Sequence, residues 1–120
     1  MATKFATTVL SASTISGDAV KNRKGEDLGT IKDLMIDTGS GRVAYAVLSF
    51  GGFLGMGDKL FAVPFKALDL DTNNHCFHLD VDKERLEKAH GFDPNHWPDM
   101  ADPSWQSDVH GVYGVDPYWD

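Results

Sequence analysis

Residues 41–64, GRVAYAVLSFGGFLGMGDKLFAVP, restrict the fold of this chain more than any other segment does. Two apolar runs, 42–50 and 60–63, flank a glycine-rich loop. Alternate residues of the first run fall on two faces, with Val43, Tyr45 and Val47 on one and Ala44, Ala46 and Leu48 on the other. A strand that is apolar on both faces is typical of the centre of a sheet, and small alanines allow a curved sheet to close. The run therefore predicts a central strand in a small, curved β structure.

The residues before this run predict a hairpin. Residues 38–41, Thr-Gly-Ser-Gly, supply a tight turn, because glycine enters positive φ without a steric penalty from a Cβ atom. Residues 28–37 alternate well enough for a half-buried strand, but which side chains face inward is ambiguous. A bulge near Lys32 and Asp33 would resolve the ambiguity, since one extra residue reverses the inward face. The other expected elements are a strand at 19–22, a helical turn at 64–68, a hairpin turn at 70–74, a strand at 75–81 and a helix at 83–90, which Asp82 caps and Gly91 ends.

The last thirty residues differ in composition from the rest of the chain. They hold four of the five prolines, all three tryptophans and two of the three tyrosines. A disordered tail would lack these aromatic side chains. We expect the tail to dock on the barrel or on a second subunit, with its prolines keeping the backbone extended. The aromatic residues expected to dock are Trp97, Trp105, Tyr113, Tyr118 and Trp119.

Three segments in order, DLGTIKDLMID, GRVAYAVLSFGG and KLFAVPFKAL, resemble the PRC-barrel family. The resemblance covers about residues 16–81 and includes Gly29 and Pro64, which follows a barrel strand. This family shares its small β-barrel with the cytoplasmic domain of the reaction-centre H subunit and the C-terminal domain of the ribosome maturation factor RimM. The tail DPNHWPDMADPSW looks like that of the stand-alone bacterial members. The resemblance implies an adaptor or assembly module, with no enzyme activity common to the family.

Together, these patterns predict a mainly β fold, a small PRC-type β-barrel with one short C-terminal helix and an ordered aromatic tail. Residues 1–15 would form an N-terminal arm, either mobile or an edge strand, 16–91 the barrel with its accessory helix, and 92–120 the acidic, aromatic tail. The lone cysteine, Cys76, excludes an internal disulfide framework and favours a reducing compartment. The N-terminus lacks the continuous apolar stretch of a secretory signal, and we expect a cytoplasmic protein.

Charge and hydropathy argue against two kinds of partner, nucleic acids and membranes. The net charge of −7 is concentrated in the tail. Residues 1–90 hold 11 basic and 12 acidic residues, whereas residues 91–120 hold no basic residue and six aspartates. This distribution disfavours direct nucleic-acid binding, which requires clustered lysine and arginine. The longest apolar segment, 43–60, is interrupted by glycines, so the sequence predicts no membrane span.

The glycine-rich loop and the tail supply the candidate partner contacts. Phe53, Leu54 and Met56 stand at the loop tip, where they form either a contact surface or a lid over the barrel. The loop lacks the GK[ST] ending of a phosphate-binding loop. In the tail, the candidate contacts are Trp97, Trp105, Tyr118 and Trp119. The tail either straps the barrel of its own chain or crosses to a second copy, and we expect self-association as a homodimer and an unidentified protein partner.

One strand raises the question of a metal site. Cys76 and His78 share a face and His75 is adjacent, with Asp80 as the third side chain on that face. A closed site would need a further ligand, such as His90, His96 or His110, from elsewhere in the chain. The residues alone favour a solvated strand face with an incidental cysteine, and we predict no cofactor or metal.

The sequence holds no recognisable constellation of nucleophile and base. Ser49 lacks the surrounding elbow motif of a hydrolase, and Asp33 and Asp37 are too far apart along a strand for a tight carboxylate pair. We therefore predict a non-catalytic protein-binding or assembly module. The alternatives are a metal-binding protein or enzyme that uses Cys76 and His78, and an accessory factor linked to the ribosome or to RNA processing.

Overall fold

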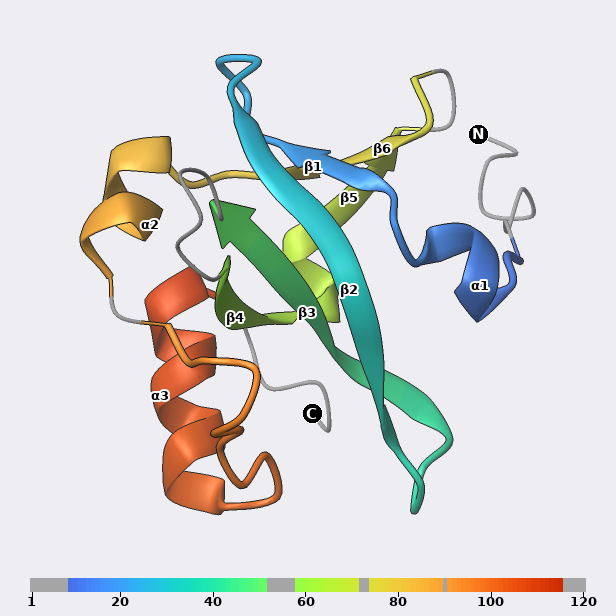
Figure 1. Cartoon of the computed structure of the whole chain (residues 1–120). Helices are drawn as coiled ribbons and strands as arrows, with labels where there is room; N and C mark the ends of the chain where they lie inside the picture. Colours follow the sequence, from blue (N-terminus) through green and yellow to red (C-terminus); the bar gives the residue numbers. More distant parts are fainter. Residues whose placement is uncertain (1–8, 52–57, 72–73, 90, 116–120) are drawn as a thin grey trace.

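The computed structural model describes residues 9–51, 58–71, 74–89 and 91–115. Its largest element is a six-stranded sheet in the order β4-β3-β2-β1-β6-β5, which curls into a half-barrel (Figure 1). The strands are β1 (Ala19–Lys21), β2 (Asp27–Asp37), β3 (Arg42–Gly51), β4 (Asp58–Pro64), β5 (Leu68–Asp71) and β6 (Cys76–Leu79). The helices are α1 (Ala12–Ile15), the 3-10 turn η2 (Phe65–Ala67), α2 (Lys83–Lys88) and α3 (Pro103–Tyr113).

The long hairpin of β2 and β3 forms the middle of the sheet. Its register shifts between Ile31 and Asp33, which confirms the bulge expected near Lys32. A second shift lies between Met35 and Ile36. Because of the first shift, Ile31 and Leu34 both pack on the main core although they are three residues apart, and Ile31 is 1% exposed. On the other side, β1 pairs antiparallel with β2 and parallel with β6, so the start of the barrel is joined to its last strand.

Gly29 allows β2 to approach β3 closely. Its φ of +125° is strained for any residue with a side chain. A Cβ atom on Gly29 would lie 2.0 Å from the carbonyl oxygen of Ser49. Because a backbone atom blocks that position, the contact between these strands requires glycine.

The inner face of the sheet carries the main hydrophobic core. Leu28 and Val20 are 0% and 1% exposed. Its buried members come from β1, β2, β3, β4, β6 and α2, with one more from α1 and one from the segment between β6 and α2. The buried cluster comprises Ile15, Val20, Leu28, Ile31, Ala46, Leu48, Phe50, Phe61, Val63, Phe77, Leu79, Val81 and Leu86. We call this set the inner cluster.

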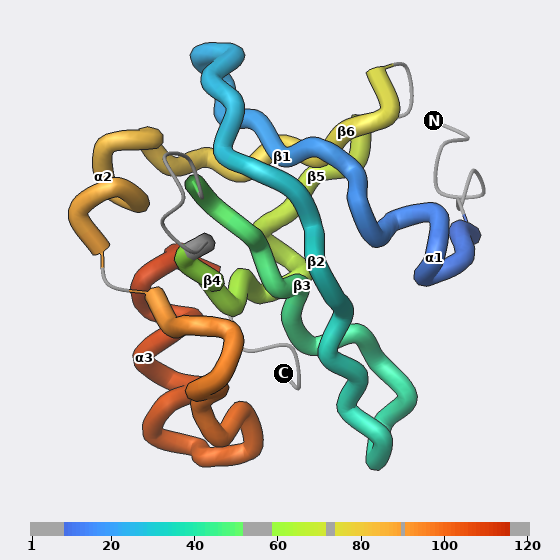
Figure 2. Tube along the Cα trace, in the orientation of Figure 1, coloured from blue at the N-terminus to red at the C-terminus, as the bar shows by residue number. Residues whose placement is uncertain are grey.

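The outer face of β3 and β4 is covered by the tail. The ring of Trp105 packs edge to face on Tyr45 with centroids 5.1 Å apart, and His110 contacts the same ring at 5.5 Å. Figure 2 shows α3 beside β4, next to this face. The outer cluster consists of buried Ala44, Tyr45 and Ala62 with Met35, Phe92, Met100, Trp105 and Val109 packed against them. This second layer explains why β3 is apolar on both faces.

The tail also pairs with the edge of the sheet. Leu60 and Phe92 exchange two backbone hydrogen bonds of 2.8 Å, which forms an antiparallel bridge. Gly91, at φ +60°, precedes the bridge, and a Cβ atom there would lie 2.7 Å from the Leu60 carbonyl oxygen. Lys59 donates to the carbonyl oxygens of Glu87 and Ala89 at 2.6 and 3.1 Å, and so ties β4 to the end of α2.

The expectation that prolines keep the tail extended is wrong for residues 103–113. These residues form α3, in which Pro103 is the first helical residue and its missing N–H is no loss. The Asp102 side chain accepts from the Ser104 N–H at 3.0 Å as the N-cap, and Gly114 ends the helix at φ +66°. These are ordinary start and stop signals, and the prolines and aromatic residues of the tail obscured them.

Three smaller differences concern the barrel half. Residues 70 and 71 belong to β5 and not to a turn, because Leu68 and Leu70 alternate with two aspartates in a short edge strand. Residues 12–15, within the expected arm, form α1 and not an edge strand. Helix α2 ends at Lys88 with Ala89 as its C-cap, whereas the prediction extended to residue 90, which lies outside the described residues.

Candidate functional site

An open groove lies between the β2–β3 hairpin and the segment that leads into α3. Its volume is about 350 Å³. One wall comes from the hairpin and the other from the tail, and Ile36 at the rim is 52% exposed. The lining residues are Met35, Ile36, Asp37, Thr38, Ala44, Tyr45, Met100, Ala101 and Gln106.

Local hydrogen bonds hold both walls of this groove. On the hairpin, the Asp37 carboxylate accepts from the N–H groups of Gly39 and Ser40 at 2.9 and 3.2 Å. In the tail, the Gln106 side chain donates to the carbonyl oxygen of Met100 at 2.8 Å. Each wall of the groove is therefore held by hydrogen bonds within its own segment. Its mixed apolar and polar lining can accept an apolar side chain and orient a polar group beside it.

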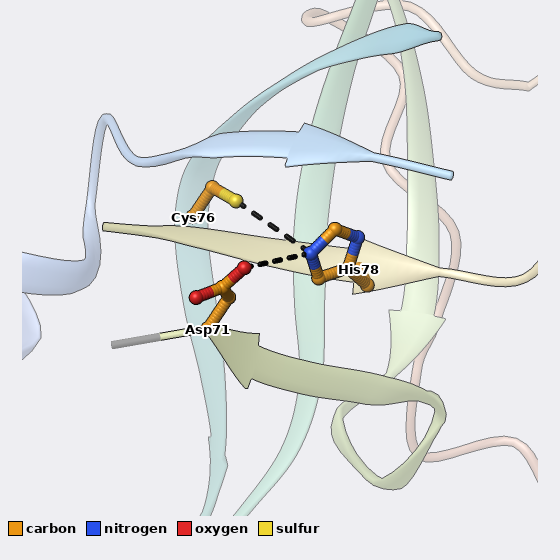
Figure 3. Close-up of side chains that lie close together, drawn as sticks. All are labelled: Asp71, Cys76 and His78. Carbon is orange, nitrogen blue, oxygen red and sulfur yellow. Dashed lines mark hydrogen bonds and ion pairs between the residues drawn. The ribbon is translucent and has the colours of Figure 1, made fainter. Parts of the chain in front are cut away.

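A second region is a cluster of three potential metal ligands on β5 and β6. The register places Asp71 directly opposite Cys76, and His78 lies two residues further along the same face. The His78 Nε2 atom is 3.1 Å from Asp71 Oδ2 and 3.9 Å from Cys76 Sγ (Figure 3). The ligand atoms of all three side chains lie within 4.8 Å of one another.

The cluster is shielded from solvent on one side. Cys76 is 4% exposed, while the side chains of Asp71 and His78 are 21% and 36% exposed. The Asn74 side chain donates to Asp71 at 2.8 Å, and its backbone N–H donates at 3.1 Å. These hydrogen bonds, together with the His78 ring, lower the pKa of Asp71 to about 2. The carboxylate is therefore ionised and held in place at neutral pH.

The three side chains do not form a catalytic relay. In a nucleophile–imidazole–carboxylate triad, the base contacts the nucleophile with one ring nitrogen and the carboxylate with the other. Here, both contacts of His78 involve the same atom, Nε2. A nitrogen that donates its proton to Asp71 cannot also remove a proton from Cys76. The arrangement is instead a group of three potential ligand atoms within 4.8 Å of one another.

The structure corrects the predicted third member of this cluster. Cys76 and His78 share a strand face as expected, but Asp80 points elsewhere, with its carboxylate 3.5 Å from Arg23. The carboxylate that joins them is Asp71. Sequence reasoning missed it because residue 71 was assigned to a turn. The only available signal was the alternation of Leu68-Asp69-Leu70-Asp71, which predicts a strand able to pair with 76–79.

The other histidines considered as ligands lie elsewhere or are not described. His96 pairs with Asp93 in the tail at 3.1 Å. His110 belongs to α3 and is 2% exposed, and its Nδ1 donates to the Gln106 carbonyl oxygen one turn earlier at 2.7 Å. His90 lies outside the described residues. Within the described part of the chain, the metal-ligand cluster therefore has three members.

The predicted partner contacts fall into two groups. Phe53, Leu54 and Met56, as well as Tyr118 and Trp119, lie outside the described residues, so their roles stay predictions.

In the described tail, Trp97 is 37% exposed and packs on Phe92 with ring centroids 5.3 Å apart. Trp105 is half-buried against Tyr45 of the same chain. Its contact is thus with the barrel, and a partner role for either tryptophan stays a prediction.

Comparison with known proteins identifies the family. The sequence model of the PRC-barrel domain matches residues 7–86, about two thirds of the chain. The chain therefore belongs to the PRC-barrel domain family, as its strand segments indicated. No curated protein matched the chain. Among the described residues, no helix has the length and apolar character to cross a membrane.

Proposed function

We propose that this PRC-barrel protein is a non-catalytic module that binds a protein partner in the groove between the β2–β3 hairpin and α3. The observation that supports the proposal is a groove with Ile36, a large aliphatic side chain, 52% exposed at its rim. Exposed aliphatic side chains beside a concave apolar surface are typical of protein contacts.

The lining indicates the chemistry of the partner. Met35 and Met100 stand on the two walls, and unbranched, polarizable methionine side chains adapt to irregular apolar surfaces. Among the lining residues, all of which are described, Asp37 is the only carboxylate and there is no basic side chain. The proposed ligand is therefore an apolar side chain of another protein, with a neighbouring hydrogen-bond donor that could pair with the Asp37 carboxylate.

A second copy of the same chain is the first partner to test. A two-fold dimer places the same patch of both copies in contact, so one exposed Ile36 per chain would contribute twice. The loop residues Phe53, Leu54 and Met56 and the tail residue Trp97 are further proposed contacts. A cytoplasmic location stays a prediction.

The test is the substitution Ile36→Asp, with Val112→Asp as its matched control. Val112 on α3 is 50% exposed and does not line the groove, so the control adds the same charge at the same exposure elsewhere. We expect Ile36→Asp to weaken self-association, or capture of partners from the native host, by about tenfold or more, since a charge would enter an apolar contact. Sedimentation velocity measures the first and affinity purification with mass spectrometry the second.

Wild-type protein and Val112→Asp should behave alike in both measurements. If the wild type is monomeric at all concentrations and Ile36→Asp captures the same proteins in the same amounts, the groove is not the contact surface and the proposal fails.

A further inference from the structure

We propose that Asp71, Cys76 and His78 form a binding site for a divalent transition-metal ion, with Zn²⁺ as the preferred ion. This inference goes beyond the proposed protein-binding function, because the cluster shares no residue with the groove. The three residues offer a carboxylate oxygen, a thiolate sulfur and an imidazole nitrogen. These are the three kinds of donor that protein zinc sites use.

The two separations measured from His78 are close to those around a tetrahedral ion, and the third pair of ligand atoms lies within 4.8 Å. Zinc bonds of about 2.3 Å to sulfur and about 2.1 Å to nitrogen or oxygen place two tetrahedral ligands roughly 3.4–3.6 Å apart. The observed separations from His78 Nε2 are 3.1 Å to Asp71 Oδ2 and 3.9 Å to Cys76 Sγ. These values lie on either side of the expected range. Small rotations of the side chains would therefore equalise them.

The convergence on one ring nitrogen favours a metal ion over a hydrogen-bonded cluster. A single Nε2 proton can be directed at Asp71 or at Cys76, but it cannot serve both contacts well. A cation between the three atoms would attract all of them at once. It would replace the Nε2 proton and the thiol proton, with His78 carrying its proton on Nδ1.

The surroundings hold the ligands and balance the charge. Asn74 fixes the Asp71 carboxylate, and Cys76 and His78 are held by pairing of β6 with β1 and β5 on its two sides. Next to His78 in the register are Lys21 on one side and Asp69 on the other, so the flanking charges are opposite. The Asp71 carboxylate and the Cys76 thiolate together match the charge of a divalent ion.

The donor set also restricts which ion fits. Calcium and magnesium prefer oxygen ligands only, whereas the sulfur and nitrogen donors suit zinc and neighbouring transition metals. Three protein ligands leave one tetrahedral position for water or for a group from another molecule. The side chains of His78 and Asp71 are 36% and 21% exposed, so solvent reaches the cluster.

The test uses full-length protein without a histidine tag, reduced and stripped of metal with a chelator. We titrate it with Co²⁺, whose bond to a thiolate gives a near-ultraviolet charge-transfer band, and then displace the Co²⁺ with Zn²⁺. We expect one ion per chain. Each of the substitutions Cys76→Ser, His78→Gln and Asp71→Asn should raise the apparent Kd by about tenfold or more, because even residues that only support metal ligands change affinity by about 10- to 100-fold.

The matched control is His96→Gln. His96 and Asp93 lie the same 3.1 Å apart as His78 and Asp71, but they belong to an exposed tail segment and are not part of the cysteine-containing cluster. This substitution should leave Co²⁺ and Zn²⁺ binding unchanged. Thermal unfolding provides a second readout, since Zn²⁺ should raise the Tm of the wild type and of His96→Gln, and raise it much less in the three cluster variants.

Two outcomes would overturn the site. The first is a wild-type protein that shows no charge-transfer band and no rise in Tm with Zn²⁺. The second is a band that only Cys76→Ser removes, while His78→Gln and Asp71→Asn bind as the wild type does, which would mean metal capture by a thiol alone. Because Asp71→Asn changes a single atom, it keeps the test valid if the buried Cys76→Ser variant fails to fold.

Discussion

The two faces of the β3–β4 region are covered in different ways. The inner cluster is built mainly from side chains of the strands themselves, whereas the outer cluster depends on tail residues such as Phe92, Trp105 and Val109. The inner cluster contains 13 buried residues, and the outer cluster contains three buried residues with partly buried ones around them. The barrel is therefore expected to derive most of its stability from the inner face, with the tail as a cover that can loosen separately.

The largest loss of stability should come from a substitution in the inner cluster. Leu28 is 0% exposed, and Leu28→Ala would remove its contacts and leave a cavity. We expect a loss of about 2–5 kcal/mol in the free energy of unfolding, as for other buried leucines. Chemical denaturation monitored by circular dichroism measures this loss. Leu70→Ala is the control, because Leu70 is 36% exposed and should cost much less; equal losses would contradict the placement of the core.

A substitution in the outer cluster should cause a smaller loss of stability. Trp105→Ala removes the ring that packs on Tyr45, but the half-buried position should limit the loss to about 1–3 kcal/mol. Helix α3 should detach from the sheet before the barrel half unfolds. Limited proteolysis should then cut within residues 92–115 faster than in the wild type, while the barrel half stays resistant. Trp97→Ala, at a more exposed position, should change the cleavage little. A variant that unfolds as a whole would show that the two faces are one cooperative unit.

The smallest effect should appear only at alkaline pH. Tyr113 packs against the inner cluster, and burial raises its pKa to about 12 from an ordinary value of 10.0. The folded state therefore favours the neutral phenol. Its contribution to stability is fully present below pH 10 and is lost as the pH rises from 10 towards 12.

The measurement is the free energy of unfolding against pH for the wild type and for Tyr113→Phe. The wild type should lose stability more steeply than the variant in the alkaline range, and the two curves should run parallel at neutral pH. Parallel curves throughout would mean that Tyr113 is not buried between the tail and the barrel.

Sequence patterns predicted the middle of the sheet well, because β3 is apolar on both faces and residues 38–41 carry a strong turn signal before it. They missed β5, since an edge strand of alternating leucine and aspartate carries few strand-forming residues. They also missed α3, whose capping residues Asp102 and Gly114 flank a segment with little helical periodicity.

Local sequence patterns could not predict sites that are formed by segments far apart in the chain. The groove joins Met35 to Met100, and no spacing in the sequence predicts that contact. Asn22 is a similar case. It is 3% exposed, and its amide donates to the Val81 carbonyl oxygen at 3.0 Å as well as to Glu26. From the sequence, Asn22 is simply the end of a strand before a turn.

The bridge between Leu60 and Phe92 indicates that the folded unit extends beyond the residues that the family model matches. The family match stops at residue 86, yet the partner of Leu60 at the β4 edge comes later in the chain. A fragment cut at that family boundary would present unpaired N–H and C=O groups at Leu60, which recruit strands from neighbouring molecules. The smallest fragment that resists such association should therefore extend past Phe92, and deletion studies that follow the family boundary would produce oligomers unrelated to the native protein.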